Sequence, residues 1–90
     1  MSKILRKACA GTFESSDAYV EISPGSGGIE LDIDSVVEQQ FGEQIRTSAT
    51  AQLEKLGIEN AHVILKDRGA LDCVICARIE AAVKRGAQND

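Results

Sequence analysis

Two short segments with alternating hydrophobic and polar residues flank a serine-rich break near the start of the chain. They are residues 7–13, KACAGTF, and residues 17–23, DAYVEIS, and in the second segment Val20 and Ile22 share a face. Alternation with a period of two is typical of a half-buried strand, and two such strands around a short polar break predict a hairpin. The residues expected at its tip are Glu14, Ser15 and Ser16.

A glycine-rich loop separates this hairpin from a third predicted strand. Residues 23–28, SPGSGG, contain the only proline of the chain and three glycines, which end a strand and provide a flexible connection. In residues 29–34, IELDID, three aliphatic side chains alternate with three acids, so one face is apolar and the other acidic. Residues 60–67, NAHVILKD, are expected to form a fourth strand.

Hydrophobic positions that recur every three or four residues predict a helix between the third and fourth strands. It is expected to start at Val36, because Ser35 and Glu38 have the spacing of a capping box, and to stop at Gly57. Its apolar stripe consists of Val37, Phe41, Ile45, Ala49, Leu53 and Leu56.

A second helix is predicted after the turn at residues 67–69, DRG. It is expected to run from about Ala70 to Arg85 and to end at Gly86, leaving the sequence AQND as a frayed tail. Its apolar stripe consists of Leu71, Val74, Ile75, Ile79, Ala82 and Val83.

The predicted order of elements is therefore βββαβα. Helices on one face of a sheet are the natural way to bury such stripes, so we expect an α+β fold with two layers. It consists of a mostly antiparallel four-stranded sheet with two helices packed on one face. The length of 90 residues allows one hydrophobic core, and residues 1–90 are expected to form a single domain with short flexible termini.

The charge balance argues against nucleic-acid binding. Fourteen acidic and ten basic residues give a net charge of -4, which repels the phosphate backbone. The three aromatic residues are too few for a base-stacking platform. The start of the chain lacks the apolar run of a signal peptide, and no stretch reaches the length of a membrane span. With an odd number of cysteines, this favours a reduced, cytoplasmic protein.

Few residues are candidates for chemistry. His62 is the only histidine, so it has no second imidazole to act with, and it is expected to be structural or merely exposed. Cys73 and Cys76 have C-x-x-C spacing, which fits ordinary packing or surface thiols, a redox pair, or a metal site. A zinc site would need two further ligands, and only Cys9 and His62 are left to supply them.

Three other features have a structural and a functional interpretation each. Arg78 falls in the apolar stripe of the second helix. Structurally, it pairs with an acid or extends past the edge of the core; functionally, it faces a phosphate or a partner's carboxylate. The glycines of residues 23–28 lack the lysine of a phosphate-binding loop and are expected to form a flexible connection. Asp32 and Asp34 either bind a cation or lie on a solvated strand face.

These residues do not assemble a nucleophile, a base and an orienting acid, so the chain is expected to be a carrier, binding or interaction module. The tip serines are open to two interpretations. In an ordinary turn, serines hydrogen-bond their own backbone. A projecting hairpin tip, free of packing, also gives a modifying enzyme access to a hydroxyl group.

Several segments resemble the acyl carrier protein of citrate lyase, its gamma subunit. They are AGTFESSD at 10–17, SVVEQQFGEQIR at 35–46, DRGALDC at 67–73 and ARIEAAV at 77–83, in the order found in that family. The family more often has glycine after the modified serine. This chain has Ser16 there, which makes Ser15 the matching position and places a second hydroxyl beside it.

The resemblance implies that Ser15 is joined through a phosphodiester to phosphoribosyl-dephospho-coenzyme A, a prosthetic group that ends in a thiol. Acetyl and citryl groups would be held on this thiol as thioesters. The alpha subunit would exchange acyl groups, and the beta subunit would cleave the citryl thioester to oxaloacetate. The chain would then be a non-catalytic subunit of a lyase complex, with these subunits and the prosthetic-group transferase as partners, and with neither nucleic acid nor membrane among them.

Two alternatives remain at this point. The carrier subunit of malonate decarboxylase uses the same kind of prosthetic group on a similar serine turn, although GALD and ARIEA resemble the citrate lyase version more closely. The chain is alternatively an unmodified module that regulates a larger enzyme, and such a module would carry no added group.

Overall fold

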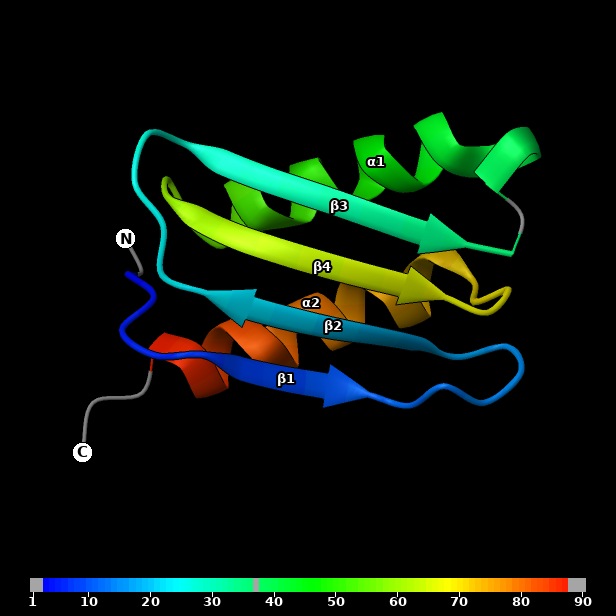
Figure 1. Cartoon of the computed structure of the whole chain (residues 1–90), viewed down its shortest axis with the longest axis horizontal. Coiled ribbons are helices and arrows are strands. Elements are labelled where there is room, and N and C mark those ends of the chain that lie inside the picture. The colour runs from blue at the N-terminus through cyan, green and yellow to red at the C-terminus, as the bar shows by residue number, and fades with distance from the viewer. Residues whose placement is uncertain (1–2, 37, 88–90) are drawn as a thin grey trace.

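The computed structural model describes residues 3–36 and 38–87, and these form a four-stranded sheet and two helices (Figure 1). The elements follow the predicted order βββαβα. They are β1 (Ala8–Gly11), β2 (Ala18–Ser23), β3 (Ile29–Ser35), α1 (Glu38–Lys55), β4 (Ala61–Asp67) and α2 (Asp72–Ala87).

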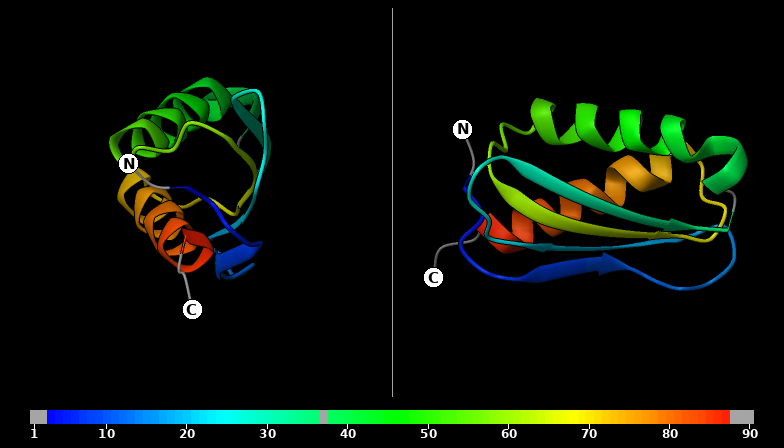
Figure 2. Two further views of the ribbon diagram at one scale, coloured as in Figure 1. Left: turned by 90° about the vertical axis from the view of Figure 1, so that its left-hand side faces the viewer. Right: turned by 45° about the horizontal axis from the view of Figure 1, so that its top comes forward.

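The sheet has the strand order β1-β2-β4-β3. β1 pairs with β2 and β2 with β4 in antiparallel fashion, whereas β3 and β4 are parallel, because the crossover through α1 returns the chain in the same direction. Both helices lie on one face of the sheet, and the other face is uncovered (Figure 2). The α+β fold predicted from the sequence, mostly antiparallel and with two layers, is confirmed.

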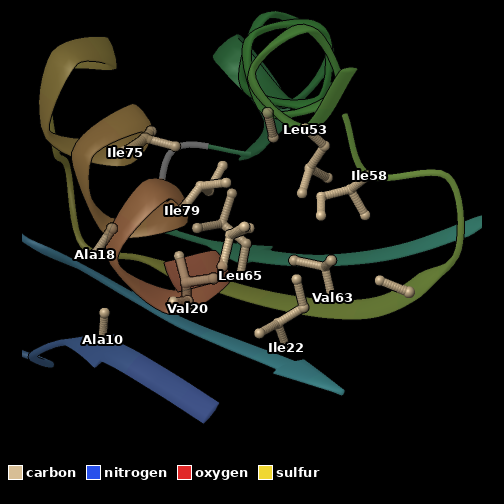
Figure 3. Close-up of a cluster of buried hydrophobic side chains, with 14 of the residues drawn as sticks. Ala10, Ala18, Val20, Ile22, Leu53, Ile58, Val63, Leu65, Ile75 and Ile79 are labelled. Carbon is tan, nitrogen blue, oxygen red and sulfur yellow. The ribbon is translucent and has the colours of Figure 1, made fainter. Parts of the chain in front are cut away.

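The core lies between the sheet and the two helices (Figure 3). Strands β2 and β4 contribute alternate residues that are almost completely buried, as the period of two predicts. Helix α1 contributes Ile45, Ala49 and Leu53, which are spaced by four residues and therefore share one face. Helix α2 contributes Ile75, Ile79, Ala82 and Val83.

Helix α1 ends as predicted at Gly57, which has a φ of +77°. The amide of Gly57 donates to the carbonyl of Glu54, and the amide of Ile58 donates to the carbonyl of Leu53, both at 3.0 Å. This pair of bonds is the Schellman motif, which requires a left-handed residue after the last helical turn. Glycine adopts that conformation without a steric penalty.

The predicted start of α1 is displaced by two residues. The helix begins at Glu38 rather than Val36, and Ser35 still belongs to β3. The hydroxyl of Ser35 donates to a carboxylate oxygen of Asp67 at 2.8 Å, so the strand extends to this contact before the helix starts. Residue 37 and the side chain of Phe41 lie outside the described residues.

The predicted limits of α2 are wrong at both ends. Leu71 lies before the helix and is 71% exposed instead of buried in the apolar stripe. Gly86 does not end the helix, which continues to Ala87, the last described residue. Gly86 is buried, and a Cβ atom there would lie 3.2 Å from the carbonyl oxygen of Arg6. The glycine therefore allows the N-terminal segment to pack closely on the helix.

Asp67, at the end of β4, is fully buried. Its carboxylate accepts hydrogen bonds from the hydroxyl of Ser35 and from the amide of Ala70, both at 2.8 Å. One side chain thereby joins the end of β3 to the loop that leads into α2. A buried carboxylate needs such donors, because it has lost its contacts with water.

Asp67→Ala is expected to lower the free energy of unfolding by about 3 kcal/mol, because it removes a buried carboxylate that accepts two hydrogen bonds, from the half-buried hydroxyl of Ser35 and from the half-buried amide of Ala70. Asp67→Asn is the matched control. Its side-chain oxygen still accepts from Ala70, and its NH2 group can donate to the hydroxyl of Ser35. Urea denaturation should therefore show a much smaller loss for the asparagine variant, and equal losses would contradict this account of the site.

Candidate functional site

The hairpin tip, residues 12–17, lies at the end of the molecule opposite the first and last described residues (Figure 1). Ser15 and Ser16 are exposed there, as predicted from the sequence. The amide of Asp17 donates to the carbonyl of Glu14 at 3.1 Å, which closes a four-residue turn with the two serines at its centre. Ser16 has a φ of +65° whereas φ is not positive at Ser15, and this combination at the third and second residues is that of a type II turn.

The backbone of the tip is held in place, contrary to the expectation of a tip free of packing. The amide of Ser16 donates to the carbonyl of Arg68 at 2.8 Å, and the amide of Arg68 donates to the carbonyl of Asp17 at 3.0 Å. These bonds extend the antiparallel pairing of β2 with β4 beyond the pair Ala18 and Asp67. The serine side chains are thus accessible, while the backbone that carries them is held by hydrogen bonds to Arg68.

Asp17 connects the tip to helix α2. Its two carboxylate oxygens accept from Nε and Nη2 of Arg78 at 2.9 and 2.8 Å. The same carboxylate accepts from the hydroxyl of Thr12 at 2.6 Å and from the amide of Ala18 at 2.7 Å. Of the two interpretations of Arg78, the structure shows the ion pair with an acid, in the bidentate geometry that only arginine provides.

These contacts hold the pKa of Asp17 well below its usual range, and the hydrogen bonds from Arg78 contribute most, followed by those from Thr12 and the Ala18 amide. The pKa of Arg78 is raised in turn by its bonds to Asp17. A carboxyl group whose pKa is lower in the folded chain favours folding above its unfolded pKa, and this effect is lost as the pH falls through the lower value. The ion pair is therefore intact at neutral pH.

Gly11 provides the space for this contact. It has a φ of +99°, and a Cβ atom there would collide with the carbonyl oxygen of Ala18 and lie 3.2 Å from Cδ of Arg78. The end of β1 therefore approaches β2 and the arginine side chain more closely than any other residue type would allow.

An aromatic pair flanks the tip on the uncovered face of the sheet. The rings of Phe13 and Tyr19 are stacked with centroids 4.6 Å apart, and Nζ of Lys66 lies 5.9 Å from the centroid of the Phe13 ring. Phe13 nevertheless remains 56% exposed. The neighbouring Cys9 thiol, together with burial, raises the pKa of Tyr19 to about 12, so its hydroxyl group stays protonated at neutral pH.

Ser16→Gly is expected to stabilise the fold by about 0.5–1 kcal/mol, because glycine adopts a positive φ without the penalty that a Cβ atom causes. The backbone bond to Arg68 needs only the amide and is retained. Thermal unfolding should show a Tm that is higher by a few degrees. Ser15→Gly is the matched control, since φ is not positive at Ser15, and it should lower the Tm. A lower Tm for Ser16→Gly would show that the positive φ of Ser16 has no steric cost.

His62 and the loop at residues 23–28 lie away from the tip. His62 is on the uncovered face of the sheet, 2.8 Å from a carboxylate oxygen of Asp32, and this contact raises the pKa of the imidazole. Asp34 is exposed on the same face. The loop at residues 23–28 lies at the opposite end of the sheet from the tip (Figure 1). Among residues 3–36 and 38–87, no group of three or more histidine, cysteine, aspartate or glutamate side chains is arranged so that it could hold a metal ion.

The three cysteines are free thiols. Cys73 is exposed and Cys76 is half-buried on α2, and Cys9 lies on β1. Burial, followed by the nearby charge of Asp72, raises the pKa of the Cys76 thiol. A redox or metal-binding cysteine needs the opposite shift, because the thiolate is the reactive form.

Within the described residues, no helix is both long enough and apolar enough to cross a membrane.

Comparison with known proteins agrees with the resemblance in the sequence. The family model described as "ACP: Malonate decarboxylase delta subunit (MdcD)" matches residues 5–86. The citrate lyase acyl carrier protein of Escherichia fergusonii is 51% identical over 87 residues, covering 96% of this chain and 90% of the relative. That of Vibrio cholerae is 54% identical over 84 residues, covering 92% of this chain and 86% of the relative.

A solved structure shares the fold. A chain of a Pseudomonas malonate decarboxylase hetero-tetramer, crystallised in complex with malonate, aligns with a TM-score of 0.78 and 17% sequence identity. The alignment covers 94% of this chain and 91% of that one. With identities near one half over almost the whole length, the chain belongs to the family of citrate lyase acyl carrier proteins.

Proposed function

We propose that this chain is the acyl carrier subunit of citrate lyase and that Ser15 is the attachment point of phosphoribosyl-dephospho-coenzyme A, through a phosphodiester. The observation that carries the proposal is an exposed Ser15 hydroxyl on a fixed turn, in a chain about half identical to citrate lyase acyl carrier proteins. The proposed partners are the alpha and beta subunits of the lyase and the transferase that attaches the group, in the cytoplasm.

Of the two acids that flank the serines, Glu14 is exposed to solvent and Asp17 is neutralised by an ion pair. None of the side-chain hydrogen bonds found in the described part of the chain engages the Ser15 hydroxyl, so its oxygen is available for a covalent bond. Asp17, two residues away, has its charge balanced by Arg78 at 2.8 Å. A phosphodiester at Ser15 therefore does not face an uncompensated carboxylate at residue 17. The neighbouring Ser16 is small and leaves the approach open.

When attached, the group supplies a thiol that holds acyl groups as thioesters. The chain then needs no acid, base or metal of its own, since the partner subunits supply them. The fixed backbone of the tip contributes orientation, and a tethered acyl group reaches each active site at a high effective concentration.

Intact mass spectrometry tests the proposal. The chain produced together with the attaching enzymes is expected to gain the mass of one prosthetic group per molecule, and the chain produced without them is expected to have its unmodified mass. A regulatory module would show no difference between the two preparations. Failure of the group to appear in the presence of active attaching enzymes would refute the proposal.

The second candidate function is that of the carrier subunit of malonate decarboxylase. The matching family model bears the name of that enzyme, and a chain of such an enzyme shares the fold. The identity to citrate lyase carriers is near one half, however, against 17% for that chain. The acid consumed by the complex assembled on this carrier separates the two candidates. We expect consumption of citrate and none of malonate.

A further inference from the structure

We propose that the ion pair between Asp17 and Arg78 determines which of the two adjacent serines receives the prosthetic group, with Arg78 acting as a positioning residue. This inference rests on the function proposed above. It is needed because Ser15 and Ser16 have the same hydroxyl group and are both exposed. Neither the chemistry of the side chain nor its accessibility distinguishes them.

The backbone conformation does distinguish them. Ser16 has a φ of +65° and its amide is bonded to the carbonyl of Arg68, whereas φ is not positive at Ser15. The two side chains therefore leave the turn in different directions, as successive residues of a four-residue turn must. An enzyme that binds this turn in one orientation meets one hydroxyl, provided that the turn keeps its conformation.

The carboxylate of Asp17 is what closes the base of the turn. It binds the hydroxyl of Thr12, directly after β1, and the amide of Ala18, the first residue of β2, so it bridges the two strands of the hairpin. A carboxylate has two oxygens, and Arg78 occupies both of them with parallel bonds of 2.9 and 2.8 Å. The guanidinium thereby fixes the plane in which the carboxylate meets its other donors.

Arg78 is fixed in turn by the body of the protein. It lies on α2 between the buried Ile75 and Ile79, and its Cδ atom lies where Gly11 leaves room for it. The Arg78 side chain therefore holds Asp17, 61 residues earlier in the chain, at a fixed position relative to α2. Lysine would carry the charge but not the planar pair of donors, so it should replace arginine only in part.

The test measures attachment at each serine separately. Wild type, Arg78→Met, Arg78→Lys and Asp17→Asn are incubated with the attaching transferase, and the modified serine is identified by peptide mapping. We expect Arg78→Met to lower kcat/KM for attachment at Ser15 by about 10- to 100-fold and to produce modification at Ser16. Arg78→Lys should restore part of the rate and of the preference for Ser15.

Two further measurements separate positioning from general loss of structure. Lys84→Met, on the exposed side of the same helix, is the control and should behave like wild type. The double variant Asp17→Asn/Arg78→Met should lose no more of the attachment rate at Ser15 than the single variants do, because each single variant already breaks the same ion pair. Amide exchange at Ser16 should be faster in Arg78→Met, while exchange in β4 should be unchanged.

Each result has a definite meaning. If folded Arg78→Met is modified only at Ser15 and at the wild-type rate, or if Ser16 exchange is unchanged, the inference is wrong and the proposed function still stands. If Arg78→Met does not fold, Asp17→Asn and Arg78→Lys decide the same question. If the wild-type chain is modified at neither serine, the proposed function and the inference fail together.

Discussion

Replacing Ser15 with alanine is expected to abolish the mass increase produced by the attaching transferase, together with all citrate cleavage by the lyase assembled on the variant. Alanine lacks the oxygen that a phosphodiester needs, and no other part of the chain supplies a thiol at the end of a long tether. The fold should be unaffected, because the Ser15 side chain is exposed and engages in none of the side-chain hydrogen bonds found among the described residues.

Ser16→Ala is the matched control for this experiment. It removes the neighbouring hydroxyl from the same turn and keeps Ser15, so both the mass increase and the activity should remain. The circular dichroism spectra of both variants should match that of the wild type, which excludes misfolding as the cause of any loss. Modification that disappears with Ser16→Ala and persists with Ser15→Ala would show that the attachment point is Ser16.

Gly11→Ala is expected to lower the free energy of unfolding by about 3 kcal/mol. A residue with a Cβ atom has a penalty at the φ of +99° that Gly11 adopts, and the new methyl group would collide with the carbonyl oxygen of Ala18. The first residue of β2 and the side chain of Arg78 would both have to move. Urea denaturation followed by circular dichroism measures the loss.

The control for Gly11 is Gly27→Ala. Gly27 has a similar φ of +83°, but a Cβ atom there would have no other atom within 4 Å. This variant isolates the backbone penalty, and its loss of stability should be about 1 kcal/mol. If the two alanine variants lose the same stability, close approach to Ala18 is not what requires glycine at position 11.

Local signals made part of the structure predictable from the sequence. The alternation in 17–23 and 29–34 predicted which residues share a face of the sheet, because successive side chains of a strand point to opposite faces. Gly57 marked the end of a helix, because the Schellman motif is completed within a few residues. The same signal at Gly86 gave a wrong prediction of a helix end. The role of Gly86 depends on its contact with the N-terminal segment, about eighty residues earlier in the chain.

The turn that carries the two serines was predictable from the sequence, whereas the contacts that hold it in place were not. Two serines between strands indicated an accessible turn, and this was confirmed. The partner of Arg78 could not be identified, because many acids were available and the pairing with Asp17 depends on how α2 crosses the sheet. Asp67 was missed, although an acid that ends an apolar strand was a usable signal, because one of its donors, the hydroxyl of Ser35, lies 32 residues earlier in the chain.

The row of acids along β3 also has a consequence for the behaviour of the free protein. Among residues 3–36 and 38–87, no strand pairs with the outer side of β3, and Glu30, Asp32 and Asp34 are exposed along it. Two copies that approached through this strand would bring like charges together, which opposes the intermolecular β-pairing that leads to aggregation. The acidic row thus favours a protein that stays dispersed in solution.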